Sequence, residues 1–339
     1  MTRAGAVPPS TVGYPLATYR YIRLALVAVV AGLLASIALT AVGHNCWQTS
    51  ISAFYFTVSH AVFVGALCAA GVCLIAYKGL TRPEDILLNF AGFLAFVVAL
   101  VPTRSPVHNP KDPTASCGLW LPTDQDATAA VANNMTALLV GAGVGIVVYL
   151  GVRAIAGPAP SSDLAHEAGP ADTNRLPAGR LAAAADFVLK WIQVLAPLGT
   201  AATLGAGLLW FLFDRESFLA DAHSAAAIAM FSGIIAVVVL YAAYSAQHFC
   251  HCRGRGRFAV AYITIAAVMT ATLIVVGVLH VHLRTWNHGI LALEVALIVE
   301  FAVFWLLQTL DSWNGTYRPV VPRVPMPTAA GRAPASPPG

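Results

Sequence analysis

The chain has 339 residues, of which 58% are hydrophobic and 10% are charged, and its net charge is +4. Soluble domains carry roughly 25% charged residues, so this composition excludes an ordinary soluble protein. A mean hydropathy of +0.73 instead favours a chain that lies largely within a membrane.

Eight largely apolar stretches follow one another along the chain. Each is long enough to cross a hydrocarbon core of about 30 Å as a helix, and none shows the alternation of barrel strands. The sequence therefore predicts an all-α fold, a polytopic transmembrane helix bundle of about eight spans. These spans are predicted at 21–43, 57–77, 86–102, 127–150, 191–213, 223–244, 258–281 and 289–309.

The segments between and beyond these stretches divide the chain. Segments 1–20, 157–180 and 312–339 are rich in Pro, Gly and Ala, which predicts two disordered tails and a linker. The linker separates two four-span half-bundles, 21–156 and 181–311, which we expect to pack as one domain.

The basic residues predict the orientation, because Lys and Arg concentrate in cytoplasmic loops. With the N-terminus in the cytoplasm, only Arg104, Lys111, Arg215 and Arg284 face outward, while the remainder of the 19 basic residues face inward. Both termini are therefore predicted to be cytoplasmic. These inward-facing basic residues, which we call the basic collar, account for the net charge. We therefore expect membrane lipids as partners and no nucleic acid.

The composition also suggests the source of the chain. Lys is scarce, whereas Ala and Gly are abundant. That bias is typical of a GC-rich bacterial genome, so we expect a multi-pass protein of the bacterial plasma (inner) membrane.

The segment 50–103 carries a recognisable series of motifs. It begins SISAFYF, continues through VFVG and YKG, and closes with VALVPT. In this order it resembles a family of uncharacterised bacterial multi-span membrane proteins. The resemblance covers about the first third of the chain and implies no particular activity.

A more distant analogy is to the alkaline ceramidases and adiponectin-receptor-type membrane hydrolases. In those proteins histidines, an aspartate and a serine assemble a zinc site. Their last-span H-x-x-x-H is absent here, where residues 280–282 read HVH.

A candidate metal site lies on the predicted outer side, where seven of the ten histidines fall. His60, His223 and His280 each stand at the end of a span, and Asp221 is close in sequence to one of them. Three protein ligands and one water form the arrangement of catalytic zinc. A zinc-bound water there would attack a lipid ester or amide, with Asp221 as the base. Simple anchoring of histidines at the membrane interface is the competing interpretation.

Two carboxylates, Glu294 and Glu300, fall inside the last predicted span. An ionisable group at that depth is costly and is therefore a functional candidate. Glu300 is the deeper of the two and is predicted as a catalytic residue. A proton-coupled or small-molecule carrier that uses Glu300 is an alternative to the hydrolase, and a non-catalytic subunit or receptor is a third possibility. The paired Gly or Pro interruptions of many transporters are not evident, which disfavours the carrier.

Two cysteines lie in predicted outer loops. Cys46 follows the first span, and Cys117 lies in the long connection at 104–126. Because disulfides form in oxidising compartments, we expect a bridge between them.

Overall fold

The computed structural model describes residues 13–43, 47–79, 81–103, 124–156, 180–248, 256–282 and 288–313. Within these ranges every regular element is helical, with eight α-helices and one 3-10 helix. Each predicted span corresponds to one α-helix, so the all-α prediction is confirmed. The helices are α1 (Gly13–Gly43), η1 (Ser52–Phe56), α2 (His60–Ala76), α3 (Arg82–Leu100), α4 (Asp124–Ala156), α5 (Arg180–Phe213), α6 (Arg215–His248), α7 (Gly256–His282) and α8 (Gly289–Trp313).

Seven of the described helices are long and apolar enough to cross a membrane. The exception is α2, whose 17 residues reach about 25 Å at roughly 1.5 Å per residue. The short helix η1 precedes α2 and extends the same apolar segment. The chain is therefore a multi-pass helical membrane protein, as its composition predicts. Which end of the bundle faces the cytoplasm stays a prediction.

Six helices form a ring. Around it, α1 packs against α2, α2 against α3, α3 against α6, α6 against α7, α7 against α8, and α8 against α1. The ring thus takes three helices from each predicted half of the chain. Helix α5 packs on the outside against α3 and α6.

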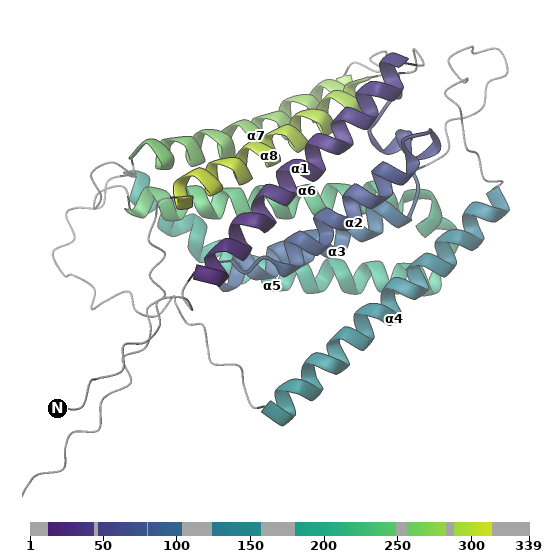
Figure 1. The fold of residues 1–339 in the computed structure, drawn as a ribbon, viewed down its shortest axis with the longest axis horizontal. Coiled ribbons are helices and arrows are strands. Elements are labelled where there is room, and N and C mark those ends of the chain that lie inside the picture. The colour runs from purple at the N-terminus through teal and green to yellow at the C-terminus, as the bar shows by residue number, and fades with distance from the viewer. Residues whose placement is uncertain are drawn as a thin grey trace, which may run out of the picture.

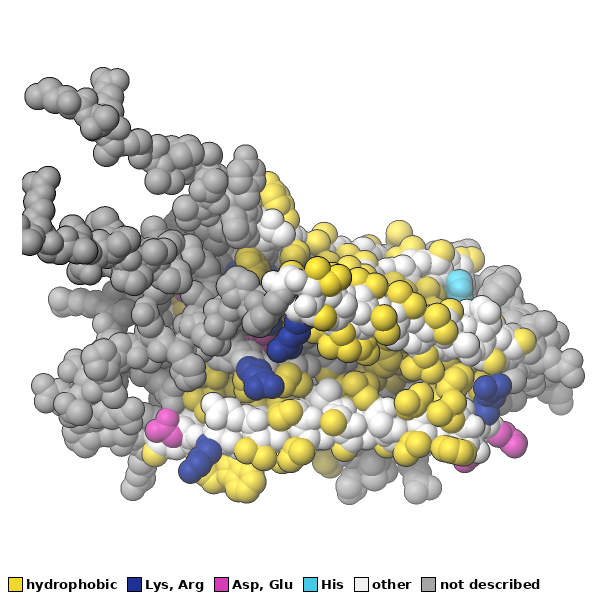
Figure 2. All heavy atoms as spheres, turned by 90° about the horizontal axis from the view of Figure 1, so that it is seen from below, with side chains coloured by type: hydrophobic (Ala, Val, Ile, Leu, Met, Phe, Trp, Pro, Cys, Tyr) yellow, Lys and Arg dark blue, Asp and Glu magenta, His cyan; other side chains and the backbone are white. Residues whose placement is uncertain are grey.

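Helix α4 runs obliquely away from the other helices (Figure 1). Its large apolar side chains, such as Val144, Val148 and Ile155, are exposed. Lipid tails are as apolar as such side chains, so this surface suits a helix surrounded by lipid. Figure 2 shows that other helices also have apolar surfaces: apolar side chains cover the helices, and charged side chains lie mainly toward their ends.

The two ends of the ring differ in what they contain. At one end α1 and α3 finish and α2, α6 and α8 begin. We call it the Glu294 end, and the opposite one, where Tyr77 follows α2, the Tyr77 end.

A close helix contact in the ring joins α2 to α3. A Cβ atom added to Gly71 would lie 2.8 Å from the carbonyl oxygen of Gly92, and one added to Gly92 would lie 2.7 Å from that of Gly71. The two backbones therefore touch, as small residues allow in membrane helix pairs. This contact fixes the height of α3 beside α2, and hence the place of both in the ring.

Candidate functional site

Between α1 and α2 the chain turns back into the bundle. Residues 51–57, which we call the strap, are all buried, and Phe54 has no exposed surface. The amide of Phe54 donates to the carbonyl of Ile51 and that of Thr57 to Phe54, which closes the 3-10 turns of η1. The run ISAFYFT contains no Gly or Pro and carries apolar or aromatic side chains on several sides. Burying these apolar side chains is favourable in free energy, which explains why the segment does not remain a surface loop.

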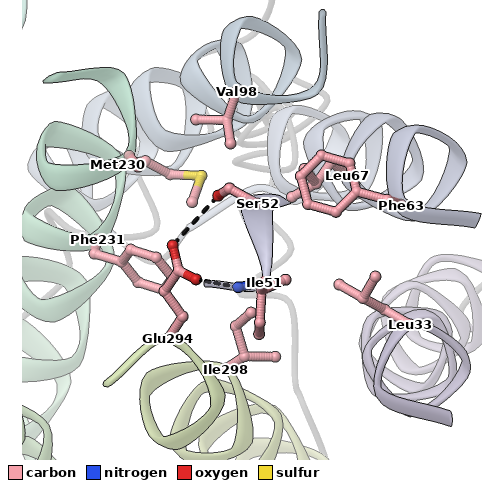
Figure 3. Close-up of a pocket in the computed structure, with 11 residues that line it drawn as sticks. Leu33, Ile51, Ser52, Phe63, Leu67, Val98, Met230, Phe231, Glu294 and Ile298 are labelled. Carbon is pink, nitrogen blue, oxygen red and sulfur yellow. Dashed lines mark hydrogen bonds between the residues drawn. The ribbon is translucent and has the colours of Figure 1, made fainter. Parts of the chain in front are cut away.

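The carboxylate of Glu294, in the second turn of α8, holds the strap (Figure 3). The amide of Ile51 donates to Oε2 at 2.5 Å, and the hydroxyl of Ser52 donates to Oε1 at 3.3 Å. Hydrogen bonds to an ionised acceptor are about twice as strong as neutral ones. Non-helical backbone is tolerated at membrane depth only where protein or trapped water satisfies its polar groups. Glu294 performs that task for the first turn of the strap.

A small cavity lies beside this carboxylate, between the strap and helices α1, α2, α3, α6 and α8 (Figure 3). The cavity has a volume of about 30 Å³, which is room for about one or two water molecules. Glu294 is its single titratable lining residue and Ser52 its single hydroxyl. The lining residues are Leu33, Ile51, Ser52, Phe63, Leu67, Val98, Ala227, Met230, Phe231, Glu294 and Ile298.

Further hydrogen bonds fix both ends of the strap. Before it, the amide of Leu291 in α8 donates to the carbonyl of Thr49 at 3.0 Å. After it, the hydroxyl of Ser59 lies 3.0 Å from that of Ser36 and 2.7 Å from that of Thr40, both in α1. The strap is thus tied to α8 at its start and to α1 at its end.

The structure places two of the three predicted metal ligands. Nδ1 of His60 lies 2.7 Å from the carbonyl oxygen of Tyr55, and its ring packs edge-on against the Tyr55 ring. His223 is buried, and its Nδ1 lies 2.6 Å from the carbonyl oxygen of Val101. Because a carbonyl only accepts, Nδ1 carries the proton in both rings. His280 lies in the last turn of α7, but its side chain lies outside the described part.

These residues do not form a metal site within the part that the structure describes. No group of three or more His, Cys, Asp or Glu side chains there is arranged to hold a metal ion. Asp221 is exposed on α6, and two residues along a helix point in directions about 200° apart, so it does not share a face with His223. The zinc site stays a prediction that depends on His280.

Glu300, the predicted catalytic residue of α8, faces a different neighbour. Its Oε1 accepts a hydrogen bond of 2.7 Å from the hydroxyl of Thr272 in α7. Glu294 and Glu300 are six residues apart, or about 120° around the helix. The more superficial carboxylate therefore lines the cavity, whereas Glu300 lies between α7 and α8.

One face of α8 connects the two ends of the ring. Glu294, Ile298, Phe301, Trp305 and Gln308 recur at helical spacing, and the last three are buried. Glu294 and Gln308 are about 21 Å apart along the axis. The buried aromatic rings between them form an apolar layer across the interior.

A second polar cluster occupies the Tyr77 end. The guanidinium of Arg23 donates to the Tyr77 hydroxyl at 2.6 Å, and this hydroxyl donates to Oε1 of Gln308 at 3.4 Å. Arg23 also donates to the backbone carbonyl of Gln308 at 3.1 Å. The cluster joins α1, the end of α2 and α8, so polar groups lie on both sides of the aromatic layer.

Sequence reasoning did not identify Ser52, Arg23 or Tyr77 as site residues. In the sequence, Ser52 stands out only as part of the SIS motif. Arg23 is only one of the basic residues predicted to face inward. One available signal was the aromatic run at 51–57 between two apolar stretches, because an exposed loop rarely carries so many large apolar side chains. Cys46 and Cys117 lie outside the described residues, so their disulfide stays a prediction.

No family model matches the chain, and neither a curated protein nor a solved structure is significantly similar to it.

Proposed function

We propose that the protein is a proton-coupled membrane carrier in which Glu294 is the proton-binding group. The observation that carries this proposal is the carboxylate of Glu294 inside the ring, bound to the first turn of the strap and next to a small cavity. Intramembrane carboxylates commonly mark proton relays, and interrupted helices near the binding site are typical of secondary transporters. The strap places 3-10 backbone, between α1 and α2, beside this carboxylate.

The surroundings of Glu294 suit a proton better than a metal cation. Oε2 already faces the N–H donor of Ile51, whose partial positive charge would repel a cation. The cavity adds one hydroxyl, that of Ser52, to an otherwise apolar lining. Hard cations need about six oxygen ligands, whereas protonation of a carboxylate needs none.

The membrane is proposed to be the bacterial plasma membrane. The scarcity of Lys and the abundance of Ala and Gly support this assignment, as does the concentration of basic residues on one predicted side.

Proton binding at Glu294 is testable before any substrate is known. A pH step applied to proteoliposomes on a solid-supported membrane is expected to give a transient current as the carboxylate takes up its proton. Glu294→Gln should lose most of this current, because the amide does not titrate. Glu300→Gln is the matched control and should keep it. A Glu294→Gln current equal to that of the wild type would reject the proposal.

A zinc hydrolase is a second candidate, favoured by one observation. Nε2 of His223 is buried and has no hydrogen-bond partner among the described residues, while its Nδ1 donates to a carbonyl. That arrangement is typical of metal-ligating histidines. If the prediction holds, the purified protein contains stoichiometric zinc, which His223→Ala loses. His288→Ala, at an exposed histidine bonded to the carbonyl of Gln48, should retain it. Metal-free protein after purification without chelators would remove this candidate.

A further inference from the structure

We infer that the strap is a gate at the Glu294 end of the ring, which opens when Glu294 is protonated. The inference deepens the function proposed above and rests on proton binding at Glu294. Three features carry it: the position of the strap, the nature of its bonds to α8, and the tethers at its two ends.

The strap forms one wall of the cavity in the present conformation. Ile51 and Phe54 pack with Leu33 of α1, Phe63 of α2 and Leu291 of α8. Ile51 and Ser52 also line the cavity, whose other walls come from the ring helices (Figure 3). Displacing this one short segment would uncover the carboxylate and its cavity without moving a ring helix.

The bonds that hold the first turn of the strap depend on the charge of Glu294. Both oxygens of the carboxylate now accept from donors, the amide of Ile51 and the hydroxyl of Ser52. A proton on either oxygen removes the charge that strengthens both bonds. Ser52 can rotate and accept instead, but the amide of Ile51 can only donate. Protonation on Oε2 would therefore place an O–H donor opposite the N–H donor of Ile51, and the hydrogen bond between them would be lost.

The tethers at the two ends do not depend on that charge. The bond from Leu291 to Thr49 is between backbone groups, and Ser59 is held by the hydroxyls of Ser36 and Thr40. These groups do not titrate in the physiological range. They act as fixed points between which the strap moves, so release is local.

Other titratable groups on the elements around the strap do not share this behaviour. They are Tyr55 on the strap, His60 on α2, His223 on α6, and His288 and Glu300 on α8, together with Arg215, Glu216 and Asp221, which are exposed at the start of α6; the described residues of α1 and α3 at this end contribute none. Each histidine donates from Nδ1 to a backbone carbonyl. A histidine retains that donor whether neutral or charged, so protonation leaves these bonds intact. Glu300 bonds to Thr272, away from the strap.

Amide hydrogen exchange of the full chain in lipid nanodiscs tests the gate. We expect the amides of residues 51–57, corrected for the intrinsic pH dependence of exchange, to lose about ten-fold protection between about pH 8 and about pH 5. Glu294→Gln should give low protection at both pH values, whereas Glu300→Gln should behave as the wild type. Equal protection of the wild-type strap at both pH values would overturn the inference, as would a Glu294→Gln strap protected like the wild type at the higher pH.

An internal reference separates gating from misfolding. Amides in the middle of α3 should stay protected in every variant and at both pH values. If α3 loses protection in Glu294→Gln, Ser52→Ala replaces it: this variant keeps the carboxylate and should show a less protected strap that still responds to pH. A Ser52→Ala strap with no pH response would count against the gate.

The gate and the carrier fail in different ways. A pH-step current without a pH-dependent strap rejects the gate and leaves proton binding at Glu294. A pH-dependent strap in wild type that disappears in Glu294→Gln supports the gate even where no substrate is transported.

Discussion

Replacing Trp305 with alanine is expected to destabilise the protein by about 3–5 kcal/mol, the range for removing a buried aromatic side chain. Trp305 is 1% exposed. Its ring centroid lies 4.9 Å from that of Tyr77, 5.5 Å from Phe304 and 6.0 Å from Phe301. The truncation would leave a cavity in the aromatic layer and would remove the support of Tyr77, which joins α1 to α8.

Reversible unfolding in mixed micelles of increasing SDS content would measure this loss. Trp313→Ala is the matched control, since Trp313 lies on the same helix and is 49% exposed. Its ring interacts mainly with the guanidinium of Arg20, 5.1 Å from the centroid, which is worth about 0.5–1 kcal/mol at an exposed site. Similar losses for the two variants would show that the aromatic layer is not packed as described.

Gly92→Ala is expected to cost about 1–3 kcal/mol by overpacking, although alanine is the better helix former. The added Cβ would stand 2.7 Å from the carbonyl oxygen of Gly71 and 2.8 Å from a side-chain carbon of Ile75. The first of these neighbours is backbone, so it moves only if α2 shifts away from α3. The same SDS titration measures the effect.

Gly65→Ala provides the comparison for this prediction. Gly65 is an exposed glycine of α2, and a Cβ there would meet nothing within 4 Å. We expect this variant to be neutral or more stable, by up to about 1 kcal/mol, because alanine favours the helix. If Gly92→Ala were as stable as Gly65→Ala, the close contact of α2 and α3 would be disproved.

Hydropathy predicted the number of helices because each one must satisfy its backbone internally and present apolar side chains to lipid. It predicted the ends less well. Helix α5 begins at Arg180, before the predicted start at 191, and α1 begins at Gly13, within the predicted N-terminal tail. Apolarity marks the part of a helix within the hydrocarbon, whereas hydrogen bonding continues along the same helix into the polar region.

The candidate site was only half predictable. Glu294 is visible in the sequence as an ionisable residue within an apolar span. Its partner Ser52 is not, because the 3-10 conformation of the strap depends on bonds to a residue more than 240 positions away. The order of helices around the ring is likewise absent from local patterns, since it depends on which surfaces fit, as at Gly71 and Gly92.

The closure of the ring by α1 and α8 sets the order in which the protein can be built. Arg23 reaches its acceptor on Gln308 only across 285 positions of the chain. During synthesis, which proceeds from the N-terminus, α1 enters the bilayer long before its neighbour α8 exists. Until then the guanidinium of Arg23 and the amide of Ile51 lack the partners that α8 provides. Biogenesis must therefore keep a half-built ring from aggregation or degradation until the last helix emerges from the ribosome.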